Sequence, residues 1–139
     1  MIELDDEVRK RLAEAIDSGN VLTAAYVDGA GKPHISFYGS THVHAPDCLA
    51  LWVRKPDSEL LKTLPARPHM AFIYGDVANR VYYTFEGRGR VAEHVRARVY
   101  DEMHPIERRF DPDAKGVPVV VELDRFTMLS TAGKVVQER

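Results

Sequence analysis

Residues 51–76, LWVRKPDSELLKTLPARPHMAFIYGD, decide the fold that we expect for this chain. The segment begins with the apolar run of a buried strand, which stops at the basic pair that starts with Arg54. Ser58 is a residue type that caps helices, and a short helix is predicted from there to about Leu64, where prolines end it. The apolar run at 69–74 predicts a second buried strand. The segment therefore predicts two buried strands joined by a basic turn and one short helix.

The overall composition is that of one ordinary globular domain. The chain has 139 residues, of which 45% are hydrophobic and 29% are charged. Its net charge of −2 gives no basic excess, which argues against general nucleic-acid binding. Cys48 is the only cysteine, so no intrachain disulfide can form and a reducing compartment is expected. The acidic N-terminus is unlike a secretory signal, and no apolar run is long enough to span a membrane. We expect a single cytoplasmic domain, 1–139, with no membrane partner.

Turn residues and hydrophobic periodicity predict the remaining elements. A first helix is expected from Asp5 or Asp6 to about Ser18, and another at 95–109, kinked or ended by Pro105. Strands are predicted at 21–27, 34–43, 49–53, 69–74, 81–91, 119–128 and 134–136. Most of these strands are joined by turns, as in antiparallel sheets. The fold class is therefore mainly β (α+β): a six- to seven-stranded antiparallel barrel with an N-terminal helix and two inserted helices.

The strand predicted at 34–43 has one notably polar face. Ser36 and Tyr38 lie on that face, whereas Phe37 and Thr41 lie on the other. A polar face next to the basic turn suggests the wall of a binding site. An ordinary half-solvated sheet gives the same pattern, and periodicity alone favours that interpretation.

The basic turn after residue 53 is a candidate phosphate site. Arg54 can grip a phosphate bidentately, Lys55 adds a point charge, and Ser58 adds a hydroxyl beside the free N–H groups of a helix start. A solvated basic turn that keeps the loop soluble is the alternative.

Histidines and arginines elsewhere carry weaker signals. His42 and His44 have the spacing of two metal ligands on one strand face, but no third ligand is evident, so surface histidines are favoured. A histidine as a haem axial ligand stays open. The arginines at 95–109 are expected to be solvated or to pair with the acidic residues of the same helix, which are Asp101, Glu102 and Glu107.

The order of these motifs resembles that of the pyridoxamine 5'-phosphate oxidase-like family, the FMN-binding split β-barrels. The segment D-G-A-G-K-P-H at 28–34 leads the second strand, and Ser58 opens the short helix. The run A-R-P-H-M-A-F at 66–72 is similar to the family's entry into its fourth strand. Y-T-F-E-G-R-G-R-V at 83–91 looks like the family's following strand. The resemblance is good over 21–91 and looser elsewhere.

The resemblance implies a homodimer with FMN in a cleft between its subunits. It places flavin-lining positions on the second strand, at the end of the third strand, at the serine and on the fifth strand. These positions fall on Ser36, Phe37, Tyr38, Thr41, Val53, Arg54, Ser58 and Tyr82. The family's Arg-Lys pair after the serine is replaced by Glu59-Leu60, so Arg54, Lys55 and Lys62 are expected to substitute. Tyr38, Tyr82, Tyr83 and Trp52 border the flavin ring or belong to the core.

By this resemblance we expect an FMN-binding oxidoreductase that transfers hydride through flavin N5 with a small organic substrate. No catalytic acid or base can be named. Residues 130–139 lack the substrate-holding tail of true pyridoxamine-phosphate oxidases, so the chain is not expected to be that enzyme. The alternatives are a deazaflavin-dependent reductase and a non-enzymatic binder of haem, another tetrapyrrole or flavin.

Overall fold

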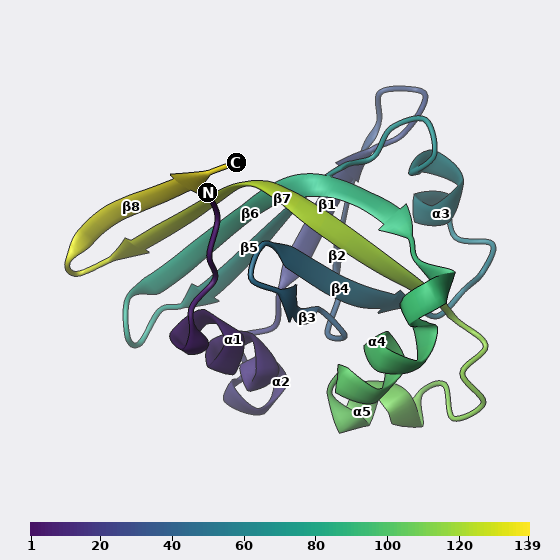
Figure 1. The fold of residues 1–139 in the computed structure, drawn as a ribbon, viewed down its shortest axis with the longest axis horizontal. Coiled ribbons are helices and arrows are strands. Elements are labelled where there is room, and N and C mark those ends of the chain that lie inside the picture. The colour runs from purple at the N-terminus through teal and green to yellow at the C-terminus, as the bar shows by residue number, and fades with distance from the viewer.

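The computed structural model describes residues 1–139, which form one open, eight-stranded antiparallel sheet flanked by short helices (Figure 1). The sheet order is β2-β1-β5-β6-β7-β4-β3, and β8 pairs with β7. The strands are β1 (Thr23–Val27), β2 (Pro33–Phe37), β3 (His42–Ala45), β4 (Cys48–Val53), β5 (His69–Asp76), β6 (Val81–Val91), β7 (Val117–Ser130) and β8 (Gly133–Glu138). The helices are α1 (Asp6–Ala13), α2 (Ala15–Ser18), α3 (Glu59–Thr63), the 3-10 turn η1 (Glu93–Val95), α4 (Arg96–Glu102) and α5 (Pro105–Arg109).

The mainly β, antiparallel split-barrel prediction is confirmed, with one more strand than expected. The strand predicted at 34–43 is two strands, because the chain turns between Tyr38 and Thr41. Ser40 explains the turn: its buried hydroxyl donates to the carbonyl of Trp52 (3.2 Å) and accepts from the N–H of Trp52 (2.9 Å). The strict alternation of faces predicted along that strand is therefore wrong beyond Phe37.

The helix boundaries follow their capping residues. Asp5 accepts a hydrogen bond from the N–H of Val8 (3.0 Å) and begins α1, and Gly19, at φ 76°, ends α2 in the left-handed conformation. The predicted first helix is thus present but interrupted at Glu14. Pro105 opens α5 after an extended residue, so the helix predicted at 95–109 is divided, as its proline indicated.

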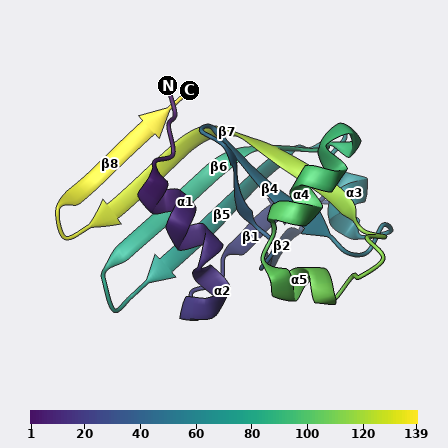
Figure 2. The ribbon, with the colours of Figure 1, turned by 60° about the horizontal axis from the view of Figure 1, so that its bottom comes forward.

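Strand β4 is buried on both faces, which accounts for its continuous apolar run. Leu49, Leu51 and Val53 face the main core inside the sheet. Ala50 and Trp52 face a smaller cluster beneath α4. In Figure 2, α4 lies over β4 and β7. Helix α1 packs against β3 and belongs to the main core on the other face of β4. This second layer of helix holds the end of β4 in a fixed position.

The loop after α5 is fastened to β4 by a buried carboxylate. Asp111 accepts hydrogen bonds from the indole N–H of Trp52 (2.8 Å) and from the backbone N–H groups of Lys115 (3.0 Å) and Gly116 (2.8 Å). Burial alone would raise the pKa of Asp111, but these bonds hold that pKa below its usual value. A Cβ on Gly116 would lie 2.4 Å from the indole nitrogen, so only glycine fits there. The loop therefore keeps α5 next to the end of β4.

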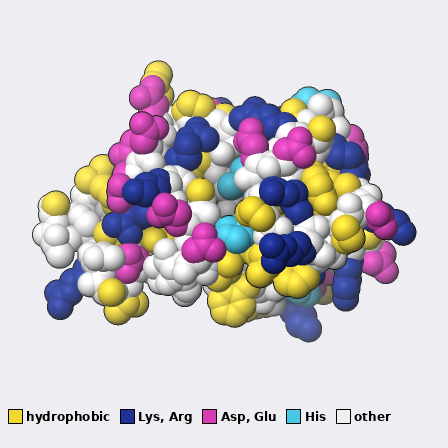
Figure 3. Space-filling model, turned by 90° about the horizontal axis from the view of Figure 1, so that it is seen from below, with side chains coloured by type: hydrophobic (Ala, Val, Ile, Leu, Met, Phe, Trp, Pro, Cys, Tyr) yellow, Lys and Arg dark blue, Asp and Glu magenta, His cyan; other side chains and the backbone are white.

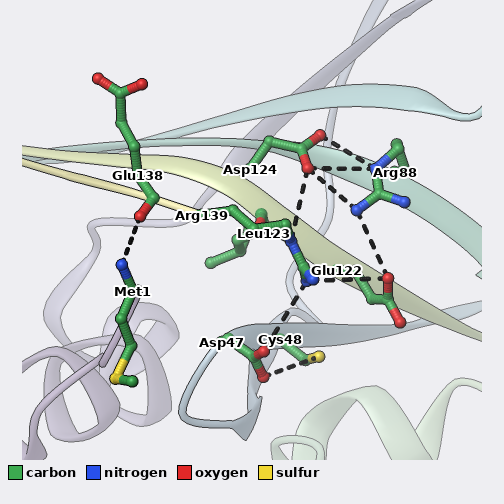
Figure 4. A network of polar contacts seen from close by, with 9 residues as sticks. All are labelled: Met1, Asp47, Cys48, Arg88, Glu122, Leu123, Asp124, Glu138 and Arg139. Carbon is green, nitrogen blue, oxygen red and sulfur yellow. Dashed lines mark hydrogen bonds and ion pairs between the residues drawn. The ribbon is translucent and has the colours of Figure 1, made fainter.

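The two chain termini meet at the start of β4 in a network of ion pairs (Figure 4). The ammonium group of Met1 donates to the carbonyl of Glu138 (2.7 Å). Arg88 makes a forked contact with Asp124 at 3.0–3.2 Å, and Arg139 lies 3.8 Å from Asp124. Arg139 also lies 3.8 Å from the carboxylates of Asp47 and Glu122. No helix of the structure is both long and apolar enough to cross a membrane.

Candidate functional site

An open cavity of about 680 Å³ lies where β4 ends, between the β2–β3 turn, the loop before α3, and helix α5. Its walls mix apolar side chains with a few charged and hydroxyl groups. They are formed by Ile16, Val21, Ser36, Phe37, Tyr38, Gly39, Ser40, Trp52, Val53, Arg54, Lys55, Ser58, Ile106, Glu107 and Phe110. Both the size and this kind of lining are typical of small-molecule and cofactor sites, which measure roughly 300–1,000 Å³.

The cavity brings together most of the site residues expected from the sequence, namely Ser36, Phe37, Tyr38, Val53, Arg54, Lys55 and Ser58. They come from two segments, 36–38 and 53–58, that are joined through β3 and the hydrogen bonds of Ser40 to Trp52. Burial raises the pKa of Tyr38, so its hydroxyl stays protonated at neutral pH and can donate a hydrogen bond.

The basic end of the cavity has cations without partners. Arg54 and Lys55 are exposed, and neither forms an ion pair or a side-chain hydrogen bond within the protein. The Arg54 guanidinium carbon lies 4.9 Å from the centroid of the Phe110 ring, a cation–π contact. Ser58 caps α3 by accepting from the N–H of Leu61 (3.4 Å), so its hydroxyl proton remains available. Because α3 has five residues, its own dipole adds little.

Three of the expected site residues, Thr41, Lys62 and Tyr82, do not line this cavity of the single chain, and their place in the site stays a prediction. Thr41 is buried beyond the β2–β3 turn, where it lines a separate cavity of about 170 Å³. Lys62 is exposed on α3, whose buried side carries Leu60 and Thr63. Tyr82 pairs with Leu129 near the start of β6. Tyr82 is not among the residues that line the cavity.

The sequence reasoning missed the wall that α5 contributes. Ile106 and Phe110 are apolar, partly exposed and four residues apart, so they share one face of the helix. Glu107 also lines the cavity and has no ion-pair partner, so none of the arginines of 95–109 pairs with it. Two exposed apolar residues at i and i+4 directly after Pro105 were the available signal for this wall.

Trp52 and Tyr83 are core residues, as one of the two alternatives for these aromatics predicted. Tyr83 is fully buried between the rings of Tyr74 and Phe126. Trp52 is 3% exposed, and its indole N–H donates to Asp111, although the residue also contributes to the cavity lining. Cys48 lies at the other end of β4, and burial raises its thiol pKa to about 11, so it is not a reactive thiolate at neutral pH.

The preference for surface histidines at positions 42 and 44 is wrong. Both side chains are more than nine-tenths buried beneath α4, whose Arg98 donates to the carbonyl of His44. The Nδ1 of His42 bonds to the carbonyl of Ser40 (2.8 Å) and therefore carries the proton, which leaves its Nε2 without a partner. Burial lowers the pKa of both imidazoles. Neither ring lines the large cavity, and no three His, Cys, Asp or Glu side chains are placed to hold a metal ion.

A second cavity of about 670 Å³ lies outside the sheet, along β1, β5 and β6. It contains the histidine at the start of β5, His69, with Arg67 from the preceding loop. Its other charged residues largely compensate one another, since Arg125 lies 4.0 Å from Glu86 and Asp124 pairs with Arg88. This cavity therefore lacks the unpaired cation pair that distinguishes the first.

Comparisons with known proteins agree on the fold. No protein-family model matches the chain, and no curated protein does. Solved structures do match: HupZ of Group A Streptococcus has a TM-score of 0.73 at 12% identity, covering 95% of this chain and 98% of its own. A protein of Clostridium acetobutylicum related to general stress protein 26, of the pyridoxinephosphate oxidase family, has a TM-score of 0.68 at 11% identity, covering 97% and 96%. A haem-binding protein from Mycobacterium smegmatis has a TM-score of 0.67 at 15% identity, covering 97% and 59%.

These similarities extend over nearly the whole chain, and the eight-stranded open sheet agrees with them. At such low identity they bear on the fold alone. The chain has the split-barrel fold of pyridoxamine 5'-phosphate oxidase-like proteins.

Proposed function

We propose that this protein is a homodimeric FMN-binding oxidoreductase that acts on a small organic substrate. The observation that carries the proposal is the pair of unpaired cations, Arg54 and Lys55, next to the Ser58 hydroxyl at the rim of a largely apolar cavity. The family to which one of the structural neighbours is assigned makes a flavin a reasonable occupant of this fold.

The donor set of the cavity suits a nucleotide with a terminal phosphate. Arg54 offers a planar fork and Lys55 a point charge, both suited to a phosphate of one to two negative charges. Phe37, Tyr38 and Phe110 provide flat apolar surface for a ring system. Arg54, Lys55 and Ser58 would therefore hold the phosphate, and the aromatic walls would hold the ring.

The isoalloxazine ring of FMN, when bound, supplies hydride transfer through its N5 atom. The chain's own residues would bind the cofactor and orient it. Arg54 and Lys55 fix the anionic end, and the protonated hydroxyl of Tyr38 can donate a hydrogen bond to an electron-rich atom in the cavity. Phe37 and Phe110 would contact the ring and shield it from water when it is bound.

An exposed apolar patch on the sheet supports the dimer. Phe37 and Ile73 lie in one row across β2, β1 and β5, and Ile35 lies in the next row. Phe37 and Ile35 are each 75% exposed, which is unusual for side chains of this size. Because Phe37 also lines the cavity, a second copy seated on this patch would cover the cavity's rim. Light scattering should give twice the 15.7 kDa mass of the chain.

The haem-binding neighbour from Mycobacterium smegmatis favours haem as a second candidate ligand. No histidine lines the cavity at the end of β4, so an axial histidine would have to come from elsewhere. His69, which lines the second cavity, is the candidate axial ligand for this alternative. Haem binding through His69 predicts a Soret band on haem addition that is lost in His69→Ala.

The test is the spectrum of the purified protein, mass spectrometry of any small molecule released from it, and titration of the stripped protein with FMN and with the deazaflavin cofactor. We expect a flavin spectrum, or strong quenching of FMN fluorescence at micromolar concentration. Protein that is colourless, leaves FMN fluorescence unchanged and gives a His69-dependent Soret band on haem addition would contradict the proposal. If the deazaflavin binds more tightly than FMN, the deazaflavin is the cofactor of this protein.

A further inference from the structure

Helix α5 presents one charged group to the cavity at the end of β4, the carboxylate of Glu107. Glu107 is half-buried, lines the cavity together with Ile106 and Phe110, and forms no ion pair or side-chain hydrogen bond. The neighbouring Arg108 is engaged elsewhere, since its guanidinium donates to the carbonyls of Asp101 (2.9 Å) and Met103 (2.6 Å). The Glu107 carboxylate therefore has no protein partner and is free to contact a ligand in the cavity.

Gly39 lets the Glu107 carboxylate approach the β2–β3 turn. A Cβ on Gly39 would lie 3.2 Å from Oε2 of Glu107 and 3.2 Å from Cδ1 of Ile16. The carboxylate therefore lies against the backbone of the turn that also carries Tyr38 and Ser40 into the cavity. Glycine serves here by its missing side chain, because its backbone is outside the left-handed region.

The cavity therefore has two groups of opposite charge that do not neutralise each other. Arg54 and Lys55 come from the end of β4, and Glu107 comes from α5. The Arg54 guanidinium carbon lies 4.9 Å from the centroid of the Phe110 ring, on the same wall as Glu107. No ion pair within 4 Å joins Glu107 to either cation.

We propose that Glu107 determines substrate specificity by selecting a small molecule with a protonated amine or a comparable cationic N–H group. This inference rests on the proposed function, because it assumes that Arg54 and Lys55 are occupied by the anionic end of the cofactor. With those cations neutralised, Glu107 is the one uncompensated charge left among the cavity's lining residues. A cationic donor satisfies it by a charge-assisted hydrogen bond, whereas an anionic substrate meets repulsion.

The test uses three probes of equal size and different charge: benzylamine, benzyl alcohol and benzoate. Their binding to the FMN-loaded protein, and to the protein stripped of flavin, is measured by calorimetry and by ligand-observed NMR. For the loaded wild type we expect benzylamine to bind about tenfold more tightly than benzyl alcohol, with benzoate weakest. In Glu107→Gln, which keeps the shape of the side chain, that preference should fall to about threefold or less, and Glu107→Lys should reverse it.

The matched control is Glu59→Gln, which removes the same charge from an exposed position outside the cavity lining. It should keep the wild-type preference. An unchanged preference in Glu107→Gln, or no detectable binding of benzylamine to the loaded wild type, would overturn the inference. These outcomes are distinct from failure of the proposed function, which would appear as loss of FMN binding in the wild type itself.

Discussion

The two ends of β4 carry similar charged side chains in opposite arrangements. At the start of the strand, next to Asp47, the side chains of Arg88 and Arg139 are each in contact with carboxylates (Figure 4). At its end, Arg54 and Lys55 have no carboxylate partner. The cations at one end are paired within the protein, whereas those at the other end are free to bind the anion that we propose.

The contrast does not come from overall charge. The face of the molecule seen in Figure 3 has basic and acidic side chains interspersed. The chain has 21 acidic and 19 basic residues, so a shortage of carboxylates does not explain why Arg54 and Lys55 are unpaired. The acidic side chain of the adjacent wall, Glu107, is likewise unpaired. Exposed ion pairs contribute only about 0–1 kcal/mol each, so the network in Figure 4 mainly fixes the termini. Unpaired charges beside a cavity, rather than charge as such, therefore identify the candidate site.

The largest effect is expected from removing the unpaired cations. Arg54→Ala combined with Lys55→Ala should weaken FMN binding by about 2–4 kcal/mol, or roughly 30- to 1,000-fold, because charge-assisted contacts to the phosphate are lost. Fluorescence titration measures the change. Both side chains are exposed, so the free energy of unfolding should stay nearly constant.

The control for that variant removes two cations from the paired end of β4. Arg88→Ala combined with Arg139→Ala should leave FMN affinity unchanged, and so should Lys62→Ala on the outer side of α3. If FMN affinity fell equally in all three variants, the loss would be a general effect of net charge and not of the cations at the cavity.

A smaller loss is expected at the carboxylate that fastens the α5 wall. Asp111→Asn keeps one acceptor oxygen but places an amide group opposite one of its N–H donors, so unfolding should cost about 1–3 kcal/mol less. Because hydrogen bonds lower the folded-state pKa of Asp111, its contribution is full above the unfolded pKa near 4 and is lost as the pH falls through the lower folded value. Urea denaturation from pH 3 to pH 7 should show this acid-side loss in the wild type, and less of it in the variant. Asp113→Asn, an exposed change in the same loop, is the control, and equal curves for both variants would contradict this role.

The smallest effect should be at the paired end. Arg139→Ala should lower the free energy of unfolding by at most about 1 kcal/mol, because its carboxylate partners lie 3.8 Å away and the side chain is half exposed. Added salt should shrink the difference further. A loss of several kcal/mol would show that the network bears on stability as well as on the placing of the termini.

Much of the fold was predictable because its signals are local. The cap at Asp5, the stop at Gly19, the serine before α3 and the turn before β2 are set by neighbouring residues, and the structure has elements that begin or end there. The division of 34–43 into two strands depends on Ser40 reaching Trp52, twelve residues away, which no local pattern shows. The burial of His42 and His44 likewise depends on α4, which is far away in the sequence.

The candidate site likewise has residues that a local segment brings together and residues whose positions depend on distant contacts. Arg54, Lys55 and Ser58 lie within five consecutive residues, so the sequence could predict that they line one cavity. Lys62 and Tyr82 were grouped with them by family likeness, but their positions depend on which side of α3 is buried and on the direction of β6. The α5 wall was missed because its place depends on the Asp111 anchor.

The most direct test of the central claim is a crystal structure of the protein grown with FMN. We predict the phosphate against the Arg54 guanidinium, the Lys55 ammonium and the Ser58 hydroxyl, with the ring beside Phe37, Tyr38 or Phe110. Flavin bound instead in the second cavity at Arg67 and Arg125, or this basic corner filled by a carboxylate of the protein itself, would contradict it.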